Sequence, residues 1–336
     1  MAFDALRRPG FPFAAATDED YSAAAFFDAV EPQDRPRAEG LANRAVCDGR
    51  SWDELEGTFA AAAMAHYNDF GHSLIYTLKS RQLVEQLGDG VLPQLLPCLA
   101  RHLSYTTRED LIPEFREYAA ALAAIEDVEA GSGDVADSVQ PALFGASTRE
   151  ALRMVVENYS RCRPQALYAA LLEPLALNLL HFDTSYQDAY DRQVSDNVGW
   201  LDFTHGVTFA NAVRRLSERH EQLWKQGLLQ MALFVGRNRA YLDKDLDAAG
   251  WQVANRDAFF AEIHDRILDH GLRDPIFSAH LVKTAVAVEE EVPLAPPACQ
   301  AALTAALNRF FHSPLKQKHP RRLARQAIDL VRRDFE

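Results

Sequence analysis

The sequence predicts an all-α protein built as one large helical bundle. Long Ala- and Leu-rich stretches carry apolar residues at helical spacing. Helix-start signals recur along the chain, whereas the alternating Val-, Ile- and Thr-rich runs typical of strands are almost absent. Because the 336 residues are enough for about two average domains, a second arrangement is two helical lobes around a central metal pocket.

The first 45 residues are expected to form an extended N-terminal arm, with at most one short helix around residues 21–30. Four prolines and several charges interrupt this stretch (Pro9, Pro12, Pro32 and Pro36). Residues 46–336 then form the helical domain. Residues 126–147 contain Gly-Ser-Gly-Asp and Gln-Pro, which indicates a break between lobes or a long surface loop.

Four local patterns predict where helices begin. In a capping box, a Ser or Thr side chain and a Glu three residues later satisfy each other's backbone amides. An acid followed by proline is a second start signal, because proline fits the first turn of a helix. These patterns occur at Ser51 with Glu54, Thr106 with Glu109, Ser147 with Glu150, and Asp274 with Pro275.

Charge and composition narrow the classes of partner. The chain has 48 acidic and 35 basic residues, and its net charge of −13 argues against nucleic acid. No apolar run reaches the ~18 residues of a membrane-spanning helix. The start lacks the apolar core of a secretory signal, and the four cysteines are widely spaced, so we expect a cytoplasmic protein that does not bind membranes.

Three histidines lie in otherwise apolar segments of the first two thirds of the chain. If residues 65–76 are helical, Asn68 and His72 lie four apart and share a face. His181 follows the apolar run 171–180, and His205 lies on a stripe with apolar neighbours. A single histidine of this kind is more often a neutral core imidazole. Several such helices together favour a metal site or proton transfer.

The segment after Pro275 places His280 and Lys283 on one stripe between Ile276 and Ala287. Burying an unpaired ammonium is unfavourable, so such a lysine is paired, neutral, chemically modified, or extended to water. A neutral lysine beside a metal can react with carbon dioxide to give a carbamate, which is an oxygen ligand. The spacing alone leaves both this role and an extended, solvated Lys283 open.

Other chemistries receive less support. A di-iron bundle needs Glu-x-x-His on two helices. The chain offers only Asp69 with His72 and Asp202 with His205, and chance alone gives about two such pairs. No Gly-rich nucleotide-binding motif, G-x-S-x-G or H-E-x-x-H occurs. These absences argue against nucleotide-binding, hydrolase and zincin classes.

Three short motifs between residues 67 and 288 resemble the questin oxidase-like family. The stretch Tyr67-Asn-Asp-Phe-Gly-His72-Ser-Leu is similar to the opening signature of that family. His280-Leu-Val-Lys283 resembles its C-terminal His-x-x-Lys helix, and Thr204-His205-Gly-Val-Thr resembles a segment between them. This chain is shorter than the fungal members, and Asp69 stands where they often carry another histidine.

The resemblance implies a helical oxygenase that opens anthraquinone-type rings. It implies a mononuclear non-haem iron held by four histidines and a carboxylated lysine, which would be His72, His205, His280 and Lys283 here, with His181 as fourth histidine and His66 in reserve. Asn68 or Asp69 would orient a ligand imidazole as part of the catalytic site.

The expected function is therefore an Fe(II)-dependent oxygenase that uses O2 on an aromatic or quinone-type, polyketide-like substrate. One alternative keeps the same residues as acid–base groups in a metal-free, NADPH-dependent Baeyer–Villiger oxidase. Another is a non-catalytic helical protein. It would bind a partner through its basic C-terminal segment, where eight Lys and Arg follow from Arg309 onward.

Overall fold

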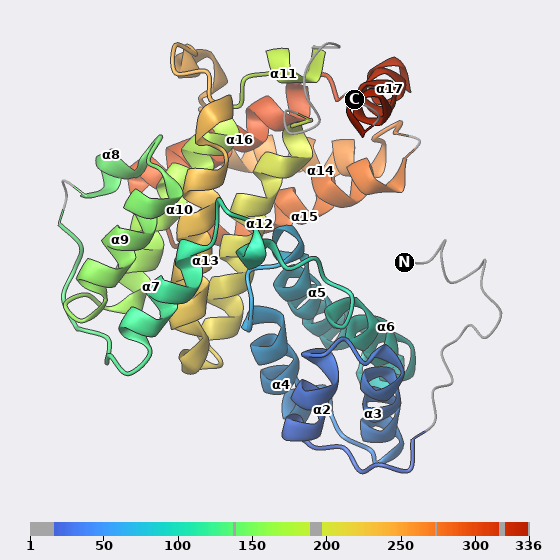
Figure 1. The fold of residues 1–336 in the computed structure, drawn as a ribbon. Helices are drawn as coiled ribbons and strands as arrows, with labels where there is room; N and C mark the ends of the chain where they lie inside the picture. Colours follow the sequence, from blue (N-terminus) through green and yellow to red (C-terminus); the bar gives the residue numbers. More distant parts are fainter. Residues whose placement is uncertain (1–16, 137–138, 189–196, 273, 316–319, 335–336) are drawn as a thin grey trace. The chain divides into compact units, whose positions relative to one another are not determined.

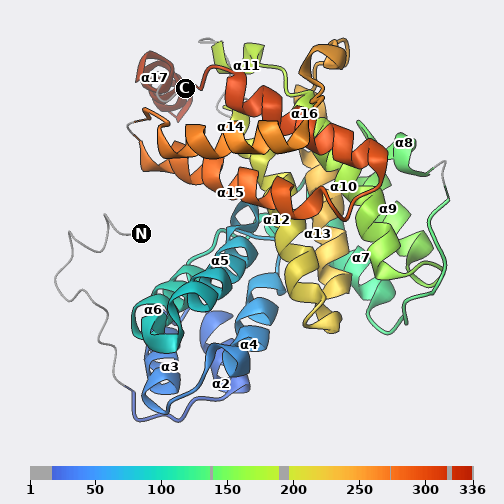
Figure 2. The same ribbon diagram turned by 180° about the vertical axis from the view of Figure 1, so that it is seen from behind.

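The computed structural model describes residues 17–136, 139–188, 197–272, 274–315 and 320–334. Within these ranges the chain is helical, and it contains isolated bridges but no β-strand (Figures 1 and 2). The predicted all-α class is confirmed. None of the described helices is long and apolar enough to span a bilayer.

The chain divides into two compact units. Unit 1 contains the residues up to Glu126 and then Ala212–Gln230, and unit 2 contains Asp127–Asn211 and the residues from Met231 onward. The first boundary lies at the start of the segment 126–147 that the sequence marked as a break. Two helices, α12 (Trp200–Ser217) and α13 (Trp224–Arg237), contribute residues to both units.

Unit 1 is built on α-helices that pack in pairs around a buried aromatic core. Helix α3 packs against α6, α4 against α5, and α2 against α3. Phe26 and Phe59 lie with their ring centroids 4.5 Å apart in this core, and Trp52 packs beside Phe59. The helices that lie wholly in this unit are α2 (Ala23–Val30), α3 (Arg35–Cys47), α4 (Trp52–Met64), α5 (His72–Leu87), α6 (Leu92–Leu103) and α7 (Glu117–Ile125).

The N-terminal part of unit 1 corrects one expectation. Helix α2 matches the short helix expected around residues 21–30, but α3 makes residues 35–45 helical rather than extended. Asp34 caps α3 by accepting the backbone N–H of Arg37, and Pro36 lies in the first turn. A proline in that position starts a helix instead of breaking it, because the N–H it lacks has no partner within the helix there.

Unit 2 centres on α10 (Pro164–Leu180), which packs along α16 (Pro297–His312). Helix α15 (Pro275–Glu291) packs on α16 and on α14 (Arg256–Leu268). The buried guanidinium of Arg309 lies over the ring of Trp200 and donates to the carbonyl oxygen of Phe182. The remaining helices wholly in this unit are α8 (Val139–Leu143), α9 (Thr148–Tyr159), α11 (Ser185–Asp188) and α17 (Pro320–Asp334).

Most predicted helix starts are confirmed. Capping boxes form at Ser51 and Ser147, and α15 begins at Pro275. The box predicted at Thr106 is wrong, because the Thr106 hydroxyl donates to the carbonyl of Leu103 and Glu109 opens only a short 3-10 turn, η3 (Glu109–Leu111). The carboxylate of Glu109 instead accepts the backbone N–H of Phe70, 39 residues earlier in the chain.

Candidate metal centre

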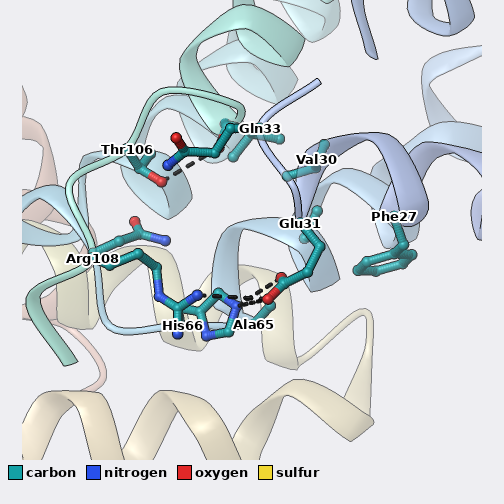
Figure 3. Close-up of a pocket in the computed structure, with 11 residues that line it drawn as sticks. Phe27, Val30, Glu31, Gln33, Ala65, His66, Thr106 and Arg108 are labelled. Carbon is teal, nitrogen blue, oxygen red and sulfur yellow. Dashed lines mark hydrogen bonds and ion pairs between the residues drawn. The ribbon is translucent and has the colours of Figure 1, made fainter. Parts of the chain in front are cut away.

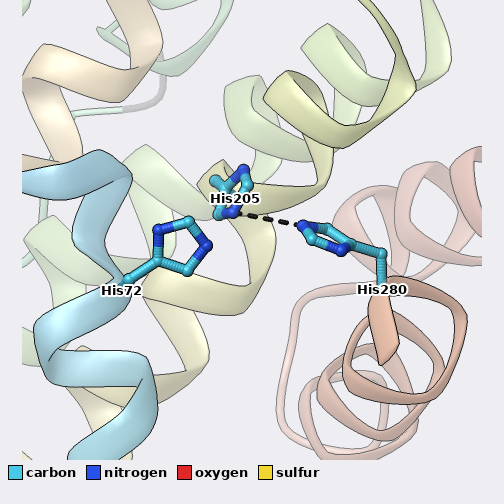
Figure 4. Close-up of side chains that lie close together, drawn as sticks. All are labelled: His72, His205 and His280. Carbon is cyan, nitrogen blue, oxygen red and sulfur yellow. Dashed lines mark hydrogen bonds between the residues drawn. The ribbon is translucent and has the colours of Figure 1, made fainter. Parts of the chain in front are cut away.

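Unit 2 brings two of the predicted ligands into contact. At the start of α12, the backbone N–H of Gly199 donates to the carboxylate of Asp202. His205 lies on α12, and His280 lies on α15. Both side chains belong to residues only 5% exposed. Their Nε2 atoms are 3.3 Å apart, and their rings meet edge to face with centroids 5.0 Å apart (Figure 4).

The backbone fixes the orientation of the His280 ring. Its Nδ1 lies 2.6 Å from the carbonyl oxygen of Ile276, and a carbonyl can only accept. The proton of the neutral imidazole is therefore on Nδ1, and Nε2 carries the lone pair that faces His205. This is the tautomer that a metal ligand requires when its other nitrogen is held by a backbone oxygen.

The separation of the two Nε2 atoms fits a shared cation. Imidazole nitrogens bind metals at about 2.0–2.1 Å, and at a tetrahedral angle two such ligands lie about 3.3 Å apart. The observed 3.3 Å agrees with that value and is long for an ordinary N–H hydrogen bond. The distance between His205 and His280 is therefore compatible with two ligands of one metal ion.

Lys283 lies on the same helix, three residues after His280. The residue is half-buried, and its Nζ atom is shielded from solvent. The apolar stripe predicted around it is buried only in part, since Ile276 at its start is 55% exposed. The shielded amine is in keeping with a lysine that does not extend to water.

In unit 1, His72 is the first residue of α5, and an unusual turn presents it. Asn68 is extended, and then Asp69, Phe70 and Gly71 have φ values of 43°, 53° and 74°. Left-handed backbone suits glycine, but it costs about 1–3 kcal/mol at each of the other two residues. The helix predicted across Asn68 and His72 is therefore wrong, because α5 begins only at His72.

The same turn sets the tautomer of His72. Its Nδ1 lies 2.6 Å from the carbonyl oxygen of Asp69, so Nδ1 carries the proton and Nε2 the lone pair. The Asp69 carboxylate lies 3.7 Å from this Nδ1 and 3.6 Å from Nε2 of His102. Asn68 is buried, and its Oδ1 accepts the hydroxyl of Ser73.

His102 is a neighbour of the Asp69 carboxylate that the sequence analysis did not single out. It lies on α6, where its ring meets Tyr76 edge to face at 4.8 Å, and Tyr76 in turn lies 5.3 Å from the ring of His72. Burial lowers the pKa of His102 to about 4, although Asp69 acts in the opposite direction. The signal was the same as for the other histidines, an imidazole in an apolar helix.

Two further candidates have other surroundings. His181 ends α10, its Nδ1 donates to the carbonyl of Asp243 at 2.8 Å, and its ring packs on Phe144. Figure 4 draws His72, His205 and His280, and His181 is not among them. Its role as fourth ligand stays a prediction. His72 belongs to unit 1, and its part in the centre stays a prediction.

His66, the reserve ligand, belongs to a charged network at a small pocket in unit 1 (Figure 3). Its Nε2 donates to Glu31 at 2.8 Å, and its Nδ1 lies 3.5 Å from Asp110. Arg108 pairs with Asp110 through two hydrogen bonds. Burial alone would lower the pKa of His66, but its bonds to Asp110 and Glu31 outweigh burial and raise it.

Comparisons of this chain with family models, with curated proteins and with solved structures found no match. The resemblance to the questin oxidase-like family stays a prediction that rests on the sequence motifs.

Proposed function

We propose that this protein is a metal-dependent oxygenase whose centre is built on His205 and His280, with His72 as third ligand. The observation that carries the proposal is the pair of Nε2 atoms 3.3 Å apart, one of them fixed as a lone-pair donor by Ile276. The tautomer of His72 is fixed in the same way, because its Nδ1–H donates to the carbonyl of Asp69. Imidazoles prepared in this way are typical ligands of transition metals.

The proposed metal is Fe(II), as the resemblance implies. Bound there, it would supply the one-electron chemistry with O2 that amino-acid side chains lack. The chain's own residues would hold the ligand imidazoles in one tautomer and keep bulk water away through their burial. The proposed substrate is an electron-rich aromatic or quinone, and Lys283 is a further proposed protein ligand after carboxylation. Asp69, beside His72 Nδ1, would orient that ring.

Metal binding tests the proposal directly. Anaerobic titration with Fe(II), and with Co(II) as a coloured substitute, should give one site per chain. His205→Ala and His280→Ala should each weaken binding at least tenfold, and His72→Ala should do the same if it is the third ligand. His264→Ala is the matched control, because His264 is exposed and pairs with Glu289.

The result also separates the alternatives. If neither Fe(II) nor Co(II) binds wild type better than His205→Ala, the metal centre is refuted. Oxidation of an aromatic substrate with NADPH by metal-free protein would then favour the Baeyer–Villiger alternative. One observation favours the alternative of a partner-binding protein. The apolar side chains of α17 are each more than half exposed (Leu323, Ile328 and Val331).

A further inference from the structure

A strap formed by residues 106–110 holds the left-handed turn that precedes His72. The two segments form an isolated antiparallel bridge between Asn68 and Arg108. The backbone N–H of Asp69 donates to the carbonyl of Thr107, and the N–H groups of Glu109 and Asp110 both donate to the carbonyl of Tyr67. The turn is thus fixed by chain some forty residues away.

One contact in this strap comes from a side chain. The backbone N–H of Phe70 donates to Oε2 of Glu109 at 3.0 Å. Phe70, at φ 53°, is the bulkiest of the three left-handed residues and the least suited to that conformation. Glu109 is only 4% exposed, so its carboxylate is placed in the interior and aimed at this amide. A buried carboxylate makes a strong charge-assisted bond to a backbone N–H.

The turn controls the geometry of His72. Because Asp69 is left-handed, its carbonyl accepts both the backbone N–H and the ring Nδ1–H of His72. If the turn relaxed toward an ordinary helical or extended conformation, this carbonyl would rotate and the ring would lose its hydrogen bond at Nδ1. The tautomer and direction of the imidazole depend on the turn.

We infer that Glu109 is a positioning residue, which holds the Asp69–Gly71 turn in its left-handed form and so fixes His72 as an Nε2 donor. The inference rests on the proposed function for its use, because His72 is the proposed third ligand. Its structural content concerns unit 1 alone and can be tested without metal.

The first experiment measures the tautomer of His72 in the metal-free protein of 336 residues. NMR of protein labelled with ¹⁵N-histidine distinguishes Nδ1–H from Nε2–H, and His72→Gln identifies the signal. Wild type should show Nδ1–H. Glu109→Leu, which keeps the bulk but removes the acceptor, should give a mixture of tautomers. Glu109→Gln still offers an oxygen to Phe70 and should behave as wild type.

The second experiment measures Co(II) affinity by competition with a chelator. Glu109→Leu should weaken binding about 10- to 100-fold, the range for residues that orient a metal ligand, and Glu109→Gln should stay within about threefold. Glu56→Leu is the matched control, because Glu56 is also buried and hydrogen-bonded but contacts Trp52 and Arg219 instead.

A second variant keeps the test decisive if Glu109→Leu fails to fold. Gly71→Ala strains the same turn from within, since its φ is 74°, and should also mix the tautomers of His72. Gly88 has a similar φ of 77° at the other end of α5, with open space around it, so Gly88→Ala should leave the tautomer of His72 unchanged.

Retention of a pure Nδ1–H signal in folded Glu109→Leu would overturn the inference, and if that variant fails to fold, retention in Gly71→Ala would overturn it. If wild type binds no metal, the proposed function fails, but the tautomer comparison still decides the role of Glu109.

Discussion

Acid should destabilise the metal-free protein through His102. Burial keeps this imidazole neutral and lowers its pKa from 6.5 to about 4, with the nearby His72 acting in the same direction and Asp69 opposing. The unfolded chain takes up the proton near pH 6.5, whereas the folded chain does so only near pH 4. His102 therefore contributes stability above pH 6.5, and this contribution is lost as the pH falls from 6.5 to 4.

The size of the effect follows from the shift. One pKa unit corresponds to about 1.4 kcal/mol, so the full loss is about 3 kcal/mol. About 2 kcal/mol of this falls between pH 7 and pH 5. The side chain of His102 is only 13% exposed, so solvent screening removes little of it.

Urea unfolding of wild type and His102→Gln at pH 7 and pH 5, with a chelator present, measures this contribution. Other titrating groups act equally in both proteins and cancel in the comparison. The free energy of unfolding should fall by about 2 kcal/mol more in wild type than in His102→Gln. Equal falls in the two proteins would refute the account of His102 as a buried neutral imidazole.

Three further predictions concern other parts of the chain. His66 has a raised pKa, so its contribution to stability is present below pH 6.5 and is lost as the pH rises through its pKa in the folded chain. The free energy of unfolding of His66→Gln should therefore differ most from that of wild type in acid. Gly236→Ala should cost about 3 kcal/mol or more in thermal unfolding, because its Cβ would lie 2.1 Å from the Thr148 nitrogen, whereas Gly250→Ala has open space and should cost little. With diamagnetic Zn(II) in place of Fe(II), ¹³C-bicarbonate should give a carbamate NMR signal that Lys283→Arg lacks, and its absence from wild type would remove Lys283 as a ligand.

Features of the fold that depend on neighbouring residues could be predicted from the sequence. The capping boxes at Ser51 and Ser147 close within one turn and use only residues that are neighbours in the sequence. The inward faces of α12 and α15 follow from helical periodicity, and this placed His205 and His280 correctly in the interior. The error at α3 was also local, because Pro36 was taken as a break and not as a helix start.

The turn before His72 could not be predicted in this way. Its sequence, Asn-Asp-Phe-Gly, has only one residue that favours a left-handed backbone. The backbone N–H groups of Asp69 and Phe70 donate hydrogen bonds to Thr107 and Glu109, and the contact with Glu109 spans 39 residues. The same long-range contact explains why the capping box predicted at Thr106 does not form, since the carboxylate it needs is used elsewhere.

The hydrogen bonds that fix the tautomers of His280 and His72 differ in a way that bears on the proposed centre. His280 donates Nδ1–H to Ile276, four residues earlier in the same helix, so α15 alone maintains its tautomer. His72 donates to Asp69, whose carbonyl is in place only while a strained turn is held. A change in the strap should therefore release His72 and leave the pairing of His205 with His280 intact. Metal binding in such a variant should weaken toward the level of His72→Ala and not fall below it, because the other two proposed ligands keep their geometry.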